Sequence, residues 1–527
     1  MEKPVNDSTT AVAPEALLAD IWKEILGVGE VGPDDDFFSL GGDSLLALKV
    51  IGAAQEQGLS LSLLDLFKNP TPRGACRSLT RATDRPAHGA LDQLSVLDRA
   101  RVPADAEDAY PAARLQLGLI YESLVSDGAF YLDVISRTVL RPLDPAALRA
   151  ALDLLSARHP LLRTRFDLGT FSEPMQLVQK EAPIPLVTAD HGDLTGSAAT
   201  EAYERVMTEL AEPYDAESAP LLRVHAAATA PGSFRLSYSF HHAILDGWSE
   251  SVFFNELVVA YAALLDGTRP EFADPVPYAE FVRLEREALR DEQSVRHFRD
   301  LQAELPPQRE ASSAEPEHRK ASADVPAEDA RRLGEMSARW GLPVKSLLLA
   351  ANCVAVGAAW ETETPAVGLL LNGRPERTGA DVTLGLFLNQ LPMRLDLRGA
   401  DWRTAARRAL DAENALLPHR RFPHSELRRL LGRNPFEVTF NYVHFHPRDE
   451  LLAAGLLAAD EDMRDHTSLP VRIEALDDPE GGGLSLHVTA DVHRFGEELP
   501  GRLVEGLLAA IHALVTDEEA AARLPWS

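Results

Sequence analysis

Two adjacent imidazoles and a carboxylate stand within one short segment of this chain. His241 and His242 come just before Asp246 and Gly247. An imidazole titrates near neutral pH, so during acyl transfer it can accept a proton from the attacking group or orient that group. Neighbouring strand residues point to opposite faces, so the two histidines differ in role. The pattern does not settle which one reacts. No third ligand stands at metal spacing, so no metal is expected.

One serine follows a pair of glycines near the N-terminus. Ser44 follows Gly41, Gly42 and Asp43 and opens an apolar helical stretch. One interpretation is an ordinary helix N-cap. The other is a site of covalent attachment. Glycines let a modifying enzyme approach the backbone closely, and a helix N-terminus tolerates the negative charge of a phosphodiester. One serine can serve both purposes.

Local periodicity predicts the elements that position these groups. Apolar residues alternate with polar ones over 234–241, which predicts a strand that ends at the histidines. A helix follows and stops near Gly267. Around Ser44, helical spacing begins at Pro14, and Thr71 precedes a proline in the pattern of a helix start. The two histidines therefore lie where a strand gives way to a loop, a common place for chemistry.

The chain divides into five predicted segments. Residues 1–12 are polar and expected to be disordered, and 83–104 read as a linker. Residues 13–82 form a small all-helical domain. The rest mixes strands and helices and is long enough for two lobes, 105–275 and 276–527. A stretch over 305–330, rich in Pro, Ala and charge, predicts a surface loop or a crossover between the lobes.

Composition excludes several classes of protein. The chain has 52 basic and 81 acidic residues, a net charge of −29, so a nucleic-acid partner is not expected. Only Cys76 and Cys353 occur, which fits a reducing compartment without a disulfide framework. The N-terminus lacks a signal-peptide pattern, and no apolar run is long enough to cross a bilayer. We expect a cytoplasmic protein with no membrane partner.

The context of Ser44 resembles the peptidyl carrier proteins of nonribosomal peptide synthetases. The resemblance covers the whole of 13–82, from the acidic loop before Phe37 to the helix at Thr71. It implies a four-helix bundle. It also implies that 4′-phosphopantetheine is attached covalently at Ser44, with Gly42 and Asp43 beside the attachment point.

The segment around the histidines resembles the HHxxxDG motif of condensation domains in the chloramphenicol acetyltransferase-like superfamily. Further family segments follow in the expected order, at Tyr110-Pro111 with Gln116, 158–166, 278–281, 385–390 and 433–438. Arg114-Leu115-Gln116 and the segment after Phe422 depart from the family pattern. The fold class implied is multidomain: an all-α carrier bundle followed by a two-lobed α/β (α+β) condensation domain.

The resemblance assigns roles to individual residues. His242 would accept the proton of an attacking amine or orient that amine, and His241 would be structural. Asp246 would form a structural ion pair with Arg374, because a buried carboxylate needs a partner. Backbone N–H groups near Gly247 would stabilise an oxyanion.

Four further side chains have two open interpretations, tunnel lining or core packing. These residues are Trp248, Asn389, His444 and His446.

The resulting hypothesis is amide-bond formation in nonribosomal peptide synthesis, a secondary-metabolite (siderophore or antibiotic) pathway. A carrier-bound amine would attack a donor acyl or peptidyl thioester tethered at Ser44. Expected partners are a downstream acceptor carrier, an upstream adenylation domain, a phosphopantetheinyl transferase and acyl or aminoacyl thioesters. Two alternatives share the fold. One is an epimerisation domain, which Trp248-Ser249 after the Asp-Gly pair disfavours. The other is a non-catalytic recruiting domain, which the intact motif disfavours.

Overall fold

A computed structural model describes most of the chain, with gaps. The described residues are 14–42, 44–81, 93–126, 128, 130–306, 308–309, 316–443, 449–465, 469–478, 483–517 and 519–523. The predicted disordered segment 1–12, residues 83–92 of the predicted linker, Asp43, His444 and His446 lie outside them. The side chain of Ser44 is likewise not described, although its backbone is.

The N-terminal unit is a bundle of four helices with a short two-stranded pairing. Trp22 and Phe37 are fully buried at its centre with their rings 5.0 Å apart. Thr71 caps the last helix by accepting the Gly74 N–H at 3.0 Å, as its spacing from Pro72 predicts. The elements are α1 (Pro14–Leu26), α2 (Ser44–Glu56), β1 (Leu59–Ser60), α3 (Leu63–Lys68), α4 (Pro72–Cys76) and β2 (Thr80–Arg81).

The first lobe that follows contains a five-stranded sheet in the order β14-β4-β9-β8-β7. Tyr238 on β9 packs its ring against Phe253 and Phe254 of the helix α9. The strands are β4 (Leu132–Val139), β7 (Leu186–Asp190), β8 (Leu222–Ala230), β9 (Ser233–His241) and β14 (Leu457–Arg464). The helices of this lobe are α5 (Val96–Arg99), α6 (Arg114–Val125), α7 (Pro145–Arg158), α8 (Ser197–Leu210) and α9 (Gly247–Leu265).

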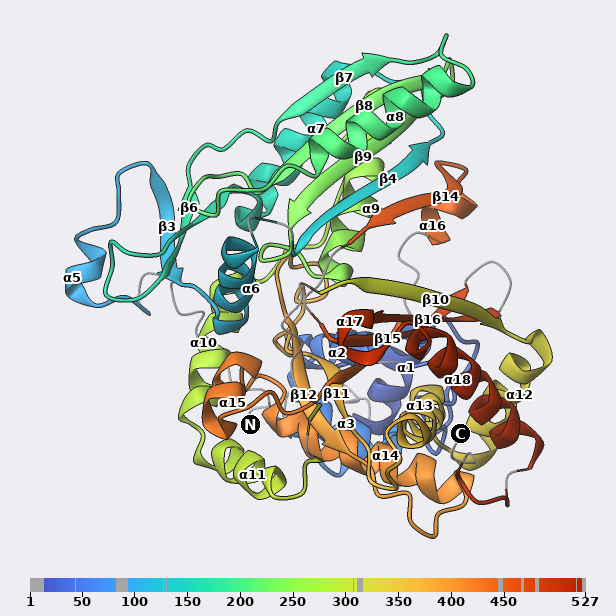
Figure 1. Cartoon of the computed structure of the whole chain (residues 1–527). Helices are drawn as coiled ribbons and strands as arrows, with labels where there is room; N and C mark the ends of the chain where they lie inside the picture. The colour runs from blue at the N-terminus through green and yellow to red at the C-terminus, as the bar shows by residue number, and fades with distance from the viewer. Residues whose placement is uncertain are drawn as a thin grey trace, which may run out of the picture.

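One strand of this sheet comes from far along the chain. β14 belongs to the segment predicted as the C-terminal lobe, yet it pairs antiparallel with β4. Figure 1 shows it beside β4, with the short helix α16 (Asp449–Ala453) next to it. The second segment of the domain therefore reaches across and completes the sheet that carries the histidines.

A smaller three-stranded sheet, β3-β6-β5, lies beside the first and has its own apolar cluster around Phe171 and Leu177. Its strands are β3 (Ala106–Pro111), β5 (Thr164–Asp167) and β6 (Met175–Gln179), with the 3₁₀ helix η2 (Pro160–Arg163) leading into β5.

The second lobe is built on a six-stranded sheet in the order β10-β16-β15-β13-β11-β12. Its strands are β10 (His318–Val325), β11 (Ala366–Asn372), β12 (Leu388–Arg394), β13 (Val438–Val443), β15 (Val471–Asp478) and β16 (Gly483–Asp491). Its helices are α10 (Tyr278–Arg290), α11 (Glu292–Gln302), α12 (Ala327–Trp340), α13 (Val344–Ala359), α14 (Trp402–Leu416), η3 (Leu417–His419), α15 (His424–Leu431), α17 (Val492–Phe495) and α18 (Leu499–Thr516).

The edge strand β10 corrects one expectation. We expected 305–330 to be a surface loop or crossover, but His318–Val325 pairs antiparallel with β16 along its whole length. Its exposed residues include the charged Lys320 and Asp324, whereas the small residues Ala321 and Ala323 pack against the core. Charges on an edge strand discourage pairing with a further chain, and they also hide its alternation in the sequence.

Among the described residues, α18 is the one helix long and apolar enough to cross a membrane by itself. It packs against α13 and against β10 and β16. A second such stretch arises only if α12 and α13, which meet at a bend of 114°, are counted as one span.

Candidate acyl-transfer site

The histidine segment continues from β9 into the helix α9. His242 follows the last residue of β9, and its N–H donates to the carbonyl of Tyr131 at 2.8 Å, so the pairing with the β4 side extends one residue further. Asp246 is the N-cap of α9 and accepts the Ser249 N–H at 2.8 Å. The strand fixes one end of the segment and the helix cap fixes the other.

The two histidines occupy different environments. His241 is buried, and its Nδ1 accepts the Ala243 N–H at 3.0 Å. Burial lowers the pKa of His241 to about 4, with a smaller contribution from His242. A neutral imidazole that holds a backbone turn is suited to a structural role.

His242 is only partly buried, and its ring meets Phe240 edge to face at 6.4 Å. Its Nδ1 is shielded and has no hydrogen-bond partner among the described residues. The proton acceptor left to a substrate is therefore Nε2. Of the two rings, only that of His242 combines partial exposure with an unused nitrogen.

Asp246 and Arg374 form a fully buried ion pair. Arg374 Nη2 lies 3.2 Å from Asp246 Oδ1, and both side chains are at most 1% exposed. The other carboxylate oxygen accepts the Phe387 N–H at 3.0 Å. Arg374 also donates to the carbonyls of Ala380 and Thr383. The pair joins the histidine loop to the second lobe.

Ser249 and Gln116 complete the support of the loop. Ser249 Oγ donates to the Gly385 carbonyl at 2.8 Å and accepts from Arg374 Nη2 at 2.7 Å. Gln116 is fully buried and donates to the Ala243 carbonyl at 2.9 Å. The resemblance pointed to Gln116, but sequence reasoning missed Ser249. Ser249 could have been found from its position three residues after Asp246, where its N–H meets the helix cap.

The remaining predicted residues are placed as follows. Trp248 is partly buried and donates from Nε1 to the Asp381 carbonyl at 2.6 Å. Asn389 donates to the carbonyls of Arg420 and Phe422 and accepts the His424 N–H, so its amide holds that turn. Gly247 is exposed, and a Cβ added there would meet no atom within 4 Å.

The glycine turn at the carrier serine leaves its outer side open. Gly41 has φ +93°, and a Cβ there would meet no atom within 4 Å. A Cβ on Gly42 would instead meet the ring of Phe37 at 2.3 Å, so the turn packs tightly inward. Ser44 then begins the 13-residue helix α2. An open turn at a helix N-terminus fits an anionic phosphopantetheine attachment.

The carrier bundle contacts the second lobe through one face of α2. Lys49 Nζ lies 3.6 Å from Asp381 Oδ2, and Gln55 Nε2 donates to the Glu376 carbonyl at 2.7 Å. Between them, Gly52 packs on Thr378, where an added Cβ would come within 2.9 Å of the backbone nitrogen. All three partners belong to the loop between β11 and β12, residues 373–387, which we call the β11–β12 loop.

The β11–β12 loop therefore contacts both the carrier and the histidine segment. Asp381 meets Lys49 with its carboxylate and Trp248 with its carbonyl. Arg374, Gly385 and Phe387 of the same loop hold Asp246 and Ser249. Residues of α2 and α3, among them Leu48 and Phe67, line one small pocket together with Leu370 of β11, and Figure 1 shows these elements in the same region.

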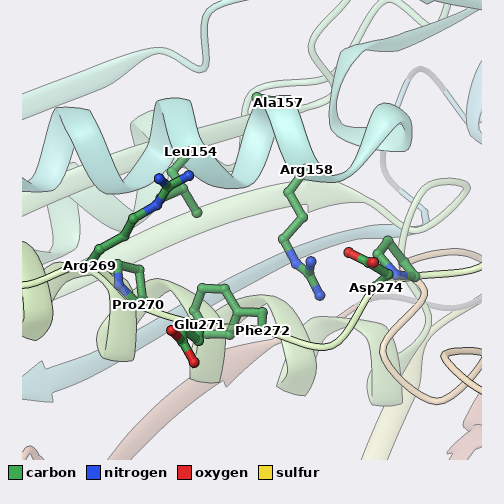
Figure 2. A pocket seen from close by; sticks show the side chains of 9 residues that line it. Leu154, Ala157, Arg158, Arg269, Pro270, Glu271, Phe272 and Asp274 are labelled. Atoms are coloured by element: carbon green, nitrogen blue, oxygen red, sulfur yellow. The ribbon is translucent and has the colours of Figure 1, made fainter.

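A surface depression lies away from the histidine segment. It measures about 820 Å³ and is open, between α7 and the segment that follows α9. Figure 2 shows Arg158, Arg269 and Phe272 among its lining side chains. None of the predicted site residues lines it. Among the described residues, no group of three His, Cys, Asp or Glu side chains is arranged to hold a metal ion.

A two-lobed fold with an HHxxxDG segment at the end of a strand is the arrangement of condensation domains with the chloramphenicol acetyltransferase-like fold. Family models match twice: the phosphopantetheine attachment site over residues 16–79 and the condensation domain over 106–524. The chain belongs to the condensation-domain family of nonribosomal peptide synthetases, with a peptidyl carrier domain preceding the condensation domain. Carrier domains of this type bear 4′-phosphopantetheine covalently on a serine.

Curated relatives are large synthetases. AMB antimetabolite synthetase AmbE of Pseudomonas aeruginosa is 36% identical over 475 residues, 86% of this chain. A dimodular nonribosomal peptide synthase of Bacillus subtilis is 28% identical over 415 residues, 75% of this chain. The chain spans 22% and 17% of their respective lengths.

The solved structures that resemble this chain include condensation domains. The first condensation domain of the calcium-dependent antibiotic synthetase, in complex with a substrate analogue, matches with a TM-score of 0.65. It is 20% identical, and the match covers 79% of this chain and 98% of that one. At that identity the likeness shows the fold alone.

Proposed function

We propose that this chain forms amide bonds, with its own carrier domain presenting the donor thioester. An amine held on a downstream carrier attacks the acyl carbon of a donor tethered at Ser44. The observation that supports this assignment is the seating of α2, which begins at Ser44, on the loop that also fixes Asp246. A carrier docked on that loop presents its prosthetic group to the histidine segment.

The phosphopantetheine group, attached at Ser44, supplies a thioester that is already activated. Holding two tethered reactants in place provides much of the rate. His242 accepts the amine proton at Nε2 or orients the amine for attack. Gly247, at the exposed start of the 19-residue helix α9, offers backbone N–H dipoles to the developing oxyanion. Asp246 and Arg374 hold these parts together.

Loading and product analysis test the proposal. A phosphopantetheinyl transferase loads the chain with an acyl-pantetheine, an aminoacyl acceptor carrier is added, and intact masses are followed. We expect the acyl group to leave this chain and appear as an amide on the acceptor. Ser44→Ala, which cannot be loaded, is the control. Inversion of the donor α-carbon without transfer, detected by chiral analysis of the hydrolysed acyl group, would indicate an epimerase. A stable acyl chain would indicate a recruiting domain.

Substitution of Gly52 tests the carrier contact. Gly52→Ala places a methyl group against the Thr378 backbone, and we expect amide formation to slow roughly fivefold or more, the effect of about 1 kcal/mol of overpacking. Alanine favours a helix over glycine, so the carrier itself gains stability. Single-turnover transfer rates measure the effect. Glu56→Ala, on the exposed side of α2, is the matched control. Equal rates for both variants would contradict this docking.

A further inference from the structure

A carboxylic acid lies buried in the strand next to the histidine segment. Asp133 is 5% exposed and stands among apolar residues of β4, with Leu132, Val134 and Ile135 also buried. An ionised carboxylate is costly to bury unless a charge or hydrogen bond compensates it. The position therefore calls for a nearby partner.

Strand register places Asp133 on the same sheet face as His242. Asp133 is directly opposite Phe240, and residues opposite each other in an antiparallel pair share a face. His242 lies two residues beyond Phe240 and keeps the pairing through its bond to Tyr131. Its ring also packs on that of Phe240. Asp133 and His242 are thus diagonal neighbours, for which Cα atoms are about 7–8 Å apart.

The charges around Asp133 single out His242. Burial raises the pKa of Asp133 to about 6, and His242 is the largest opposing influence. Asp465 and Glu250 act with the burial, and Arg472 acts against it. Asp465, Glu250 and Arg472 already have charged partners of their own. Arg472 pairs with Asp465 and Glu474, and Glu250 pairs with Arg137. On the histidine side, His241 is the other titratable neighbour of His242.

His242 needs support on its inner side. Its Nδ1 is shielded from solvent and accepts or donates no hydrogen bond among the described residues. A ring that gains a proton at Nε2 becomes an imidazolium, and a nearby negative charge stabilises a partly buried imidazolium. The sheet face behind His242 holds such a charge in Asp133.

We propose that Asp133 is a positioning residue for His242: its carboxylate, a diagonal neighbour on the same sheet face, stabilises the protonated imidazole through its charge. In the amide-forming reaction proposed above, on which this role rests, the amine nitrogen bonds to the thioester carbon and its proton moves to Nε2. The carbon–sulfur bond then breaks, and the proton passes from Nε2 to the departing thiolate. Asp133 itself exchanges no proton in this sequence.

Chemical modification tests the proposal without any acyl transfer. Diethyl pyrocarbonate acylates neutral imidazoles, and fragment ions from tandem mass spectrometry distinguish His242 from the adjacent His241. In Asp133→Asn we expect the pH of half-maximal reactivity at His242 to fall by about one unit, because a negative charge that favours the imidazolium is gone. Asp133→Glu should keep the wild-type midpoint. Asp133→Ser replaces Asp133→Asn if the latter fails to fold.

Control and rate measurements complete the test. Asp460→Asn removes a carboxylate that bonds Thr138 on the opposite face of β4, so it should leave the midpoint unchanged. In the transfer assay, Asp133→Asn should slow amide formation about tenfold to a hundredfold. An unchanged midpoint in Asp133→Asn or Asp133→Ser overturns the proposal. A shifted midpoint without any transfer by the wild type would instead refute only the proposed reaction.

Discussion

His242→Ala is expected to slow amide formation by about 10²- to 10⁴-fold while leaving the loading of Ser44 unchanged. That range is typical when a positioned proton acceptor is removed. The ring is partly exposed and contributes no side-chain hydrogen bond among the described residues, so its loss should leave the fold intact. Single-turnover transfer from the loaded chain to an aminoacyl acceptor measures the effect.

His241→Ala and His512→Ala separate chemistry from packing. His241 accepts the Ala243 N–H, so its removal leaves a buried donor unpaired, which costs about 1–3 kcal/mol. A His241→Ala variant should therefore lose stability as well as rate. His512, exposed on α18 and paired with the buried Asp329, can lose stability on removal but should keep the wild-type rate. Transfer by His242→Ala within tenfold of the wild type would assign the rate to placement of the tethered reactants alone.

Local patterns in the sequence were sufficient for the elements that carry the chemistry. The alternation over 234–241 corresponds to β9, and the helix predicted at Ser44 begins there as α2. Both follow from the spacing of apolar side chains, which depends on neighbouring residues only. The ion pair between Asp246 and Arg374 was proposed from a resemblance, and the structure contains it. Spacing alone could not have joined residues so far apart.

Long-range pairings were beyond the reach of the same reasoning. β14 joins β4 across the two lobes, and nothing in either segment specifies its partner. Asp133 gave a signal, a lone carboxylate in an apolar strand, but its closeness to His242 depends on the β4–β9 register. The contact of Gly52 with Thr378 is likewise a property of two surfaces. Such features arise from tertiary packing and are not encoded in local propensity.

The β11–β12 loop links these observations into one arrangement. Its outward groups, the Asp381 carboxylate and the Glu376 carbonyl, contact α2 of the carrier. Its inward groups, from Arg374 to Phe387, fix the cap of α9. Substitutions on the outward side should alter carrier docking, whereas those on the inward side should alter the site itself. Loading the same donor on both kinds of variant and measuring transfer therefore compares the effect of carrier docking with the effect of the site.

Arg374→Leu is expected to destabilise the condensation domain by about 3–5 kcal/mol, because it leaves Asp246 charged, buried and without its cation. It also removes the bonds to the carbonyls of Ala380 and Thr383. Urea unfolding followed by circular dichroism measures the loss. Arg332→Leu, which breaks an exposed pair with Glu328 on α12, should cost within about 1 kcal/mol.

A double variant tests whether the cost arises from the uncompensated charge. Asp246→Asn removes the charge that Arg374→Leu leaves behind, and Asn can still cap α9 by accepting the Ser249 N–H. The two substitutions together should therefore be less destabilising than their separate effects summed. Transfer should stay slow in the double variant, since an Asn whose amide oxygen caps α9 no longer accepts the Phe387 N–H with its second side-chain atom. Strict additivity would mean that Asp246 and Arg374 contribute independently, and the loop would then owe its position to Ser249 and Gln116.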